Sequence, residues 1–361
     1  MSIVFYDFFC HFLLVNPLTP PSLTSTNSFD IYIYIYIMTP EKRVIKIVYP
    51  RVHMFSMDLS LFNGNMKSGS LGCSIWDYPI KIIVTTSPSD TITGDLSYLH
   101  DKIRTIIDSF RRQENIFNQT YLVQIQSPPE VREHIGVGVT TQILAGTIEA
   151  LYEFNQKTFD IDKLLLFNVG RSSACSAQLS LHPGFILEQG YNINNTGVCL
   201  HPDLYSWKEN FEKHYYSFDQ CDWFLVLAIP TNSISLSGQL EKTFWKQFYP
   251  NNNIDALKIC YMVFQELMPA IYTKNFPRFI TAMRQITNNS SKRAEEHIQN
   301  RITKKCLTSM RRRFGFATIS SLGPTIYAFS PTKDCFIPKN NADYFFIKMQ
   351  LNKGAKIDEN K

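Results

Sequence analysis

The sequence predicts an α+β fold in two lobes, and three observations lead to this prediction. Strand-like and helix-like segments are mixed without the strict alternation of a parallel α/β protein. A glycine-spaced turn at Gly136 and Gly138 runs directly into a helical pattern. The composition changes at residues 215–222, just ahead of a long apolar segment, which predicts a domain boundary. We therefore expect one domain at residues 38–218 and a second at residues 219–361.

Hydrophobic periodicity assigns the elements of the first domain. Apolar and β-branched runs predict strands at residues 44–49, 80–84, 121–125 and 185–188. The small, glycine-spaced segment 67–75 suits a strand or turn that another backbone or a ligand approaches closely. Apolar residues at intervals of three and four predict helices at 96–111 and 143–151. Small residues in the second helix would allow close packing.

The second domain is expected to begin with a buried strand and then to combine helices with further strands. The first strand is predicted at residues 223–230. Helices are predicted at 254–272, 276–286 and 293–313, and strands within 316–330 and 344–351. No internal repeat is visible.

The composition is that of an ordinary globular protein that stays in the cytoplasm. Of 361 residues, 44% are hydrophobic and 19% are charged, which allows a sizeable core, and the net charge of +5 is mild. Eight cysteines lie apart without zinc-site spacing, which predicts reduced thiols. A late basic cluster at residues 292–313 lacks interleaved aromatic residues, so a solvated helix face is expected rather than a nucleic-acid surface.

The first 37 residues do not fit this composition. Residues 1–17 are apolar but lack the positive start and the cleavage site of a signal peptide, and they are short for a membrane span. Residues 31–37 alternate Ile and Tyr, as a translated TATATA repeat would, and Met38 follows. We expect residues 1–37 to be a spurious or disordered extension. A strand is the alternative, although an isolated edge of this kind would aggregate.

The turn at residues 133–138 has the features of an anion site. Its glycines allow tight backbone angles and close approach of a ligand. The amides of the following helix start lack intrahelical partners and are available to a phosphate. No lysine follows the second glycine, as in a Walker loop, and the third glycine of the dinucleotide fingerprint is missing. On this turn alone, phosphate binding and an ordinary structural turn both remain open.

Four blocks between Arg51 and Phe329 together resemble the GHMP kinase superfamily and, within it, the β-ribofuranosylaminobenzene 5'-phosphate synthase family of methanopterin biosynthesis. The matching residues are Arg51, His53 and Asp58; His134, Ile135, Gly136, Val137, Gly138, Thr141 and Gln142; Gly170, Arg171, Ser173, Gly184 and Phe185; and Ser320, Ser321, Gly323, Pro324 and Thr325. This resemblance implies a GHMP-like phosphate-binding first lobe with a glycine-rich loop before a helix, and a ferredoxin-like α+β second lobe.

The resemblance also implies an activity. It implies a transferase that joins phosphoribosyl pyrophosphate to 4-hydroxy- or 4-aminobenzoate with loss of carbon dioxide and pyrophosphate. The implied partners are these small molecules, without nucleic acid or membrane, and a homodimer is one option. Mg²⁺ is expected with the pyrophosphate, with Asp58 and Glu188 as candidate ligands.

The site residues follow from the same blocks. Catalytic roles fall to Asp58, His53 and Arg171. The expected substrate- and phosphate-binding residues are Arg51, Lys67, His134, Gly136, Gly138, Thr140, Thr141, Gln142, Ser173, Ser320, Ser321 and Gly323.

Departures from the family pattern keep two alternatives open. Val139 and Thr140 replace a Ser-Gly pair, Ile319 replaces a Gln, and Leu322 replaces a Trp. A small-molecule kinase of the superfamily would place ATP on the same helix start, but its usual aspartate base aligns with Ser176. A ligand-binding relative without catalysis is the other alternative.

Overall fold

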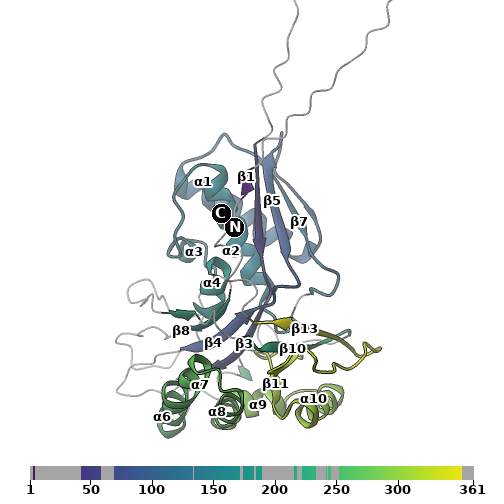
Figure 1. Ribbon diagram of the computed structural model, residues 1–361. Helices are drawn as coiled ribbons and strands as arrows, with labels where there is room; N and C mark the ends of the chain where they lie inside the picture. The colour runs from purple at the N-terminus through teal and green to yellow at the C-terminus, as the bar shows by residue number, and fades with distance from the viewer. Residues whose placement is uncertain are drawn as a thin grey trace, which may run out of the picture.

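The computed structural model describes most of the chain from residue 42 onward. The described residues are 3–4, 42–57, 69–132, 134–170, 174–182, 184–188, 215–217, 222–232, 241, 243–244 and 252–351. They form three sheets with helices at both ends of the molecule (Figure 1).

The first sheet has the strand order β1-β2-β5-β7-β6. Its strands are β1 (Ile3–Val4), β2 (Arg43–Val48), β5 (Ile80–Thr86), β7 (Tyr121–Gln126) and β6 (Thr91–Gly94). The pairs are antiparallel except for β6 and β7, which run parallel.

Two long helices, α1 (His100–Glu114) and α2 (Val139–Phe154), accompany this sheet. The helix α2 contacts β2 and β5 directly, and the two helices contact each other. A Cβ on Gly146 of α2 would lie 2.5 Å from Val48 Cγ1, so the expected close packing of small residues is confirmed. Lys46 of β2 is nearly buried, and it pairs with Glu149 and Glu153 at 2.6 and 2.7 Å.

The second sheet lies between the two ends of the molecule and is antiparallel throughout, in the order β3-β4-β8-β9 (Figure 1). Its strands are β3 (Arg51–Ser56), β4 (Ser70–Ser74), β8 (Phe185–Glu188) and β9 (Tyr215–Ser217). The register of β3 shifts between His53 and Phe55, which marks a bulge. The short helices α3 (Lys163–Leu166) and α4 (Ala174–Leu181) precede β8, and α4 packs on β3, β4 and β8.

The third sheet is antiparallel in the order β11-β12-β10-β13. Its strands are β11 (Ala317–Ile319), β12 (Ile326–Ser330), β10 (Phe224–Pro230) and β13 (Tyr344–Gln350). Below it in Figure 1 lie α6 (Asn253–Met262), a π-helical turn (Val263–Leu267), α7 (Met268–Tyr272), α8 (Phe276–Asn289), α9 (Lys292–His297) and α10 (Arg301–Phe314).

One buried apolar cluster runs through both halves of the described chain. The hydroxyl of Tyr327 on β12 donates to the carbonyl of Met54 on β3 at 3.0 Å, and both side chains are fully buried. The indole of Trp76 donates to the carbonyl of Leu351 at 3.4 Å. The second and third sheets are therefore joined by direct hydrogen bonds as well as by packing.

The structure confirms the α+β fold and corrects several elements. The single helix expected at 293–313 is wrong, because Asn300 caps a new helix by accepting from the amide of Thr303 at 2.8 Å. The segment 316–330 is two strands separated by a turn. The elements β3, β6 and α4 were not predicted. The domain boundary and the start at Met38 stay predictions, and residues 31–37 lie outside the described residues.

Two further expectations concern cysteines and membranes. The described cysteines that are assigned, Cys73, Cys175, Cys260, Cys306 and Cys335, are all free thiols. Within the described residues, none of the helices combines the length and the apolar character needed to span a membrane.

Candidate functional site

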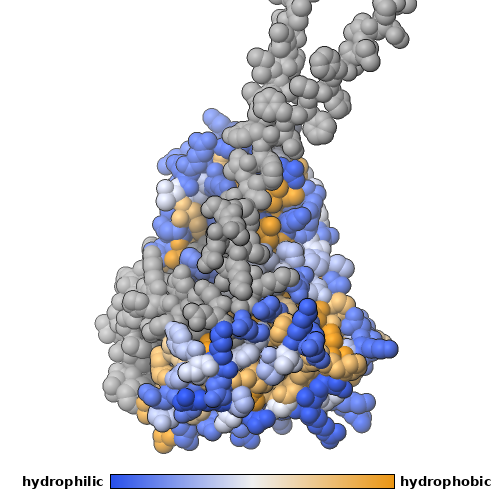
Figure 2. Space-filling model, viewed as in Figure 1, coloured by the Kyte–Doolittle hydropathy of each residue, from blue (hydrophilic) through white to orange (hydrophobic). Residues whose placement is uncertain are grey.

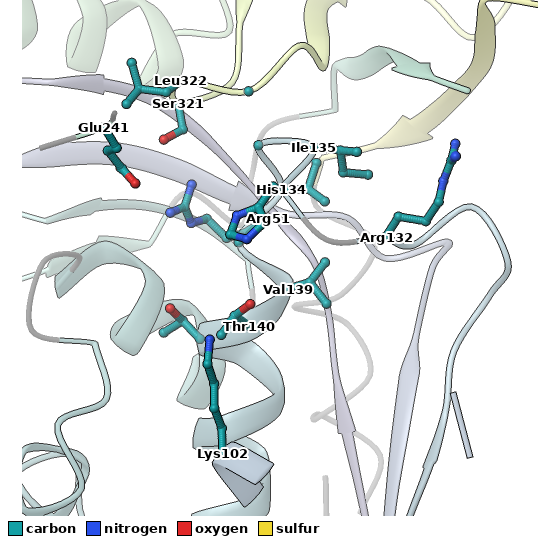
Figure 3. A pocket seen from close by; sticks show the side chains of 15 residues that line it. Arg51, Lys102, Arg132, His134, Ile135, Val139, Thr140, Glu241, Ser321 and Leu322 are labelled. Atoms are coloured by element: carbon teal, nitrogen blue, oxygen red, sulfur yellow. The ribbon is translucent and has the colours of Figure 1, made fainter. Parts of the chain in front are cut away.

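A pocket of about 230 Å³ opens where the glycine-spaced turn enters α2. Most of its wall comes from the start of β3, the turn with the first residues of α2, and the turn that follows β11, and Lys102 of α1 and Glu241 also line it (Figure 3). The lining residues are Arg51, Lys102, Arg132, His134, Ile135, Gly136, Val137, Gly138, Val139, Thr140, Thr141, Glu241, Ser321, Leu322 and Gly323.

The two glycines of the turn are required by its geometry. Gly136 and Gly138 have φ angles of 89° and 62°, where a side chain is strained. A Cβ on Gly136 would lie 2.4 Å from the carbonyl oxygen of Ser320, and one on Gly323 would lie 2.2 Å from the Cα of Gly136. The glycine turn and the turn after β11 therefore meet backbone against backbone, which no other residue type would allow.

The start of α2 brings backbone donors without intrahelical partners to the pocket. Gly138 is the N-cap and supplies no side-chain cap. The first four N–H groups of an α-helix have no intrahelical partner, and the positive end of the helix dipole lies there. Val139, Thr140 and Thr141 all line the pocket, so this helix start is available to a bound anion.

Arg51 lies directly beneath the glycine turn. Its backbone N–H donates to the carbonyl of Val137 at 2.8 Å, and its Nε donates to the Ser176 hydroxyl at 2.5 Å. A Cβ on Gly138 would lie 2.8 Å from this Nε, so the glycine makes room for the guanidinium. Burial lowers the pKa of Arg51, and the charges of Cys175 and Glu241 oppose this shift. Arginine nevertheless stays protonated in proteins, so a buried positive charge lies at the pocket wall.

Ser320 connects the three walls of the pocket. Its hydroxyl donates to the carbonyl of Gly136 at 2.7 Å and accepts from the amide of His53 at 3.1 Å. The amide of Ser321 donates to the carbonyl of His53 at 3.2 Å. Ser320 is fully buried and does not line the pocket, whereas Ser321 and Gly323 do. The structure thus brings the predicted first, second and fourth sequence blocks together.

The two predicted histidines occupy different places. His134 lines the pocket, with a φ of 53°. His53 lies behind the wall, half-buried, and no partner of its Nδ1 is found among the described residues. Burial lowers the pKa of His53 well below its usual value, and the positive charges of Arg51 and Lys292 lower it further. His53 is therefore neutral at pH 7.

Gln142 and Glu188 are buried away from the lining. The amide nitrogen of Gln142 donates to the carbonyl of Ser176 at 2.8 Å, which ties α2 to α4. The carboxylate of Glu188 accepts from the Ser70 hydroxyl at 3.4 Å, on the sheet formed by β4 and β8. Neither residue lines the pocket.

Asp58, Lys67, Arg171 and Ser173 lie outside the described residues, so their predicted roles stay predictions. Among the described residues, no group of three or more His, Cys, Asp or Glu side chains is arranged to hold a metal ion. The carboxylate that does line the pocket is Glu241.

Sequence reasoning did not assign Lys102, Arg132 or Glu241 to the site, although Glu241 belongs to a Gly-x-x-Glu-x-x-Phe segment, Gly238 to Phe244, that gives the family resemblance weaker support. Lys102 projects from α1 toward Thr140, and it makes no ion pair within the described chain (Figure 3). Arg132 extends away from the other side chains and donates to the carbonyls of Pro230, at 2.8 Å, and Thr231. No sequence signal marks Lys102, because the helix that carries it is distant in the chain. Arg132 lies only four residues before Gly136 and could have been found from that position.

The residues that depart from the family pattern differ in whether they line the pocket. Ile319 is fully buried in β11 and belongs to a core cluster of the third sheet, so it does not touch the pocket. Val139 and Leu322 are also largely buried, but both line the pocket. Val139 makes its part of the wall less polar than the serine of the family pattern would, whereas Leu322 replaces the aromatic Trp with a smaller apolar side chain.

Comparison with known proteins gives relatives along most of the chain. No model of a protein family matches it. It is 23% identical over 308 residues to the beta-ribofuranosylphenol 5'-phosphate synthase of Methanocaldococcus jannaschii, which covers 78% of this chain and 88% of the relative. It is 24% identical over 320 residues to the protein of the same name from Archaeoglobus fulgidus, which covers 85% and 97%.

Solved structures agree in fold. The phosphomevalonate kinase of Streptococcus pneumoniae superposes with a TM-score of 0.59 at 12% identity, over 80% of this chain and 91% of that one. The mevalonate kinase of L. major, in complex with R-mevalonate, gives a TM-score of 0.57 at 12% identity, over 80% and 88%. The predicted α+β fold agrees with the fold of these kinases, and the resemblance to the synthase family is confirmed.

Proposed function

We propose that this protein is a transferase that joins phosphoribosyl pyrophosphate to 4-hydroxy- or 4-aminobenzoate and releases carbon dioxide and pyrophosphate. The observation that carries the proposal is the pocket in which an uncapped helix start meets Arg51 and Lys102. Relatives named as synthases support an enzyme of that family. The substrates, the decarboxylation and the roles below are part of the proposal.

The reaction makes two demands on the pocket. The bond between the anomeric carbon and the pyrophosphate breaks, and the anomeric carbon becomes the electrophile. The ring carbon that bears the carboxylate forms the new bond, and loss of carbon dioxide returns the electron pair to the ring. The site must therefore hold a leaving group that gains negative charge and stabilise a cation-like centre beside it.

The pyrophosphate is assigned to the helix start. Val139, Thr140 and Thr141 at the helix start line the same pocket as Lys102, and Figure 3 shows the ammonium of Lys102 beside Thr140. Backbone donors at a helix N-terminus and a positive side chain suit the charge that develops on the departing group. Arg51 strengthens this positive potential from within the wall.

The aromatic acid is assigned to the part of the pocket where Leu322 and the side chain of Val139 supply apolar surface. Ser321 and His134 supply polar groups at the same opening. Lys67 and Arg171 are proposed to pair with the benzoate carboxylate or with a phosphate, as a guanidinium fork suits either. Arg132 is committed to the carbonyls at the end of β10, so it fixes the edge of the pocket.

Mg²⁺ is proposed to bind the pyrophosphate, where it would neutralise charge on the leaving group. Glu241 lines the pocket and has the carboxylate chemistry that this ion prefers, and Asp58 is the predicted second ligand. Glu188 fits less well, because it is buried against Ser70 and away from the lining.

The environment of Ser176 argues for this transferase over a kinase. A phosphoryl-transfer enzyme needs a group that positions or activates the attacking hydroxyl. Ser176 occupies the aligned position, is fully buried, and accepts a hydrogen bond from Arg51. The proposed reaction needs no such base, because the electron pair that restores the ring comes from the lost carboxylate.

Ligand-induced stabilisation separates the proposed function from its rivals. With Mg²⁺ present, phosphoribosyl pyrophosphate at about 100 times its Kd should stabilise the fold by about 2.7 kcal/mol, and ATP should not. Stabilisation by ATP alone would indicate the kinase. Stabilisation by phosphoribosyl pyrophosphate without turnover would indicate the ligand-binding relative, for which the apolar wall at Val139 and Leu322 is the supporting observation.

A further inference from the structure

A second cavity, of about 330 Å³, lies in the C-terminal part of the molecule between α8, α9, α10 and β11. It shares no lining residue with the glycine-turn pocket. Hydrophilic and apolar residues are interspersed over the lower end of the molecule, where Figure 1 places α9 and α10 (Figure 2). The lining residues are Arg284, Thr287, Asn288, Arg293, Glu296, Arg311, Gly315, Phe316 and Ala317.

Arg284 is held in place by the end of the neighbouring helix. Its Nε and Nη2 both donate to the carbonyl oxygen of Gly315, at 2.8 and 2.6 Å. Gly315 ends α10 in the left-handed conformation, with a φ of 71°. Because one edge of the guanidinium is used by this carbonyl, its position is fixed, and Nη1 makes no hydrogen bond within the described chain.

Arg311 is fixed in a similar way from the opposite side. Its Nε donates to the carbonyl of Ala317 at 2.8 Å, and its Nη2 lies 2.5 Å from a carboxylate oxygen of Glu296. The same carboxylate oxygen accepts from the Thr318 hydroxyl at 2.6 Å. One oxygen of the Glu296 carboxylate therefore already accepts from both Arg311 and Thr318.

Arg293 completes the cavity. It is exposed at the start of α9 and has no ion pair or hydrogen bond among the described residues. Three arginines and one glutamate leave the cavity with a net charge of +2. Converging like charges repel one another, and an anion that binds between them removes this repulsion.

We propose that this cavity binds a small molecule with at least two negative charges on phosphate or carboxylate groups. Guanidinium forks bind such groups through paired hydrogen bonds, and two of the three are pre-positioned by backbone carbonyls. The volume is at the lower end of the range for small-molecule sites, and buried Phe316 adds an apolar wall. The basic cluster predicted from the sequence as a solvated helix face thus divides: Arg293 and Arg311 line the cavity, and Arg312 does not.

The test is calorimetric titration of the full chain with pyrophosphate and, separately, with citrate. The wild-type protein should bind a second equivalent of at least one probe beyond the glycine-turn pocket. Combined Arg284→Gln and Arg293→Gln substitutions should weaken that second binding event at least tenfold. Arg312→Gln removes one positive charge outside the cavity, as Arg293→Gln does inside it, and should leave both events unchanged. The probe that binds the second site more tightly, pyrophosphate or citrate, shows whether the site prefers phosphate or carboxylate groups.

Arg293→Gln alone guards against a folding defect, because Arg293 makes no contact that the fold needs. It should still weaken the second event several-fold. Binding of only one equivalent of both probes by the wild-type protein would overturn the proposal. The proposal would also be overturned if the second site of the Arg284→Gln/Arg293→Gln double variant bound the probes as tightly as the second site of Arg312→Gln does.

Discussion

The side chains of the glycine-turn pocket differ in how firmly the fold holds them. Arg51 is bound by Ser176 and covered by Gly138, so its charge is part of the wall. Lys102 is exposed, approaches from α1 and has no competing ion pair within the described residues. A buried arginine sets the potential of the pocket, whereas an exposed lysine can move to meet a ligand. Lys102 is therefore the residue whose loss should affect binding without affecting the fold.

We predict that Lys102→Gln weakens binding of phosphoribosyl pyrophosphate by about tenfold or more, because a hydrogen bond to a charged group contributes about 1.5–3 kcal/mol. The melting temperature of the free protein should not change. Isothermal titration in the presence of Mg²⁺ measures the affinity. Arg104→Gln on the same helix is the matched control, since Arg104 is exposed and lies outside the pocket. Equal affinities for Lys102→Gln and Arg104→Gln would remove Lys102 from the site.

His53 predicts a pH dependence of stability. Its pKa in the folded protein lies well below the usual 6.5, because of burial and then of Arg51 and Lys292. As the pH falls through this usual value, the unfolded chain takes up a proton that folded His53 does not bind. The fold must therefore lose stability below about pH 6.5.

His53→Gln cannot take up this proton, so its stability should depend less on pH than that of the wild type between pH 7.5 and 5. Melting temperatures of the two proteins across this range measure the difference. Other titrating groups change the stability of the two proteins equally, so their contributions cancel in the difference between the two melting temperatures. Parallel curves for the two proteins would contradict the buried, neutral state of His53.

At the scale of elements, the pocket depends on two turns that meet through glycines. Gly136 in the turn before α2 and Gly323 in the turn after β11 are packed against each other with no room for a side chain. Ser320 adds hydrogen bonds to Gly136 and His53 across this contact. The contact joins elements that are nearly 190 residues apart, and it fixes how the helix start faces the C-terminal half.

We predict that Gly136→Ala destabilises the protein more than Gly315→Ala does. Both glycines have positive φ, so both substitutions introduce strain of about 1–3 kcal/mol. At Gly315 the new Cβ would meet only the end of the Arg284 side chain, at 3.0 Å, whereas at Gly136 it would meet the backbone of Ser320 at 2.4 Å. Denaturant midpoints compare the two variants. Equal midpoints would mean that the two turns separate at little cost.

At the scale of the whole molecule, much of the fold followed from hydrophobic periodicity. The strands of the first sheet and the long helices are local patterns, and α2 begins at its glycine turn as expected. The sequence alone missed β3, whose bulge at His53 interrupts the alternation, and α4, whose short run of small residues has no clear apolar face. It also joined α9 to α10, because the capping role of Asn300 was overlooked.

The site residues were predicted from sequence motifs, so the predicted site lacked the residues that lie outside those motifs. The first, second and fourth blocks do meet in the structure, since the second and fourth carry the glycines and the serine that the contact needs, and the backbone of His53 in the first pairs with Ser320 and Ser321. Lys102 and Glu241 come from elements whose approach to the pocket depends on tertiary packing. Ser320 and Gln142 belong to motifs but hold the walls together and do not face the ligand. A motif therefore indicates proximity to the site, and the structure is needed to separate lining residues from supports.

The central claim is that this pocket supports a decarboxylating transfer to phosphoribosyl pyrophosphate. The most direct measurement incubates the protein with Mg²⁺, phosphoribosyl pyrophosphate and carboxyl-labelled 4-hydroxy- or 4-aminobenzoate, and follows labelled carbon dioxide and pyrophosphate together. We predict release of both in equal amounts with one of the two acids, and a large loss of the rate in Lys102→Gln. Absence of both products, under conditions where phosphoribosyl pyrophosphate binds and a relative from Methanocaldococcus jannaschii turns over, would contradict the claim.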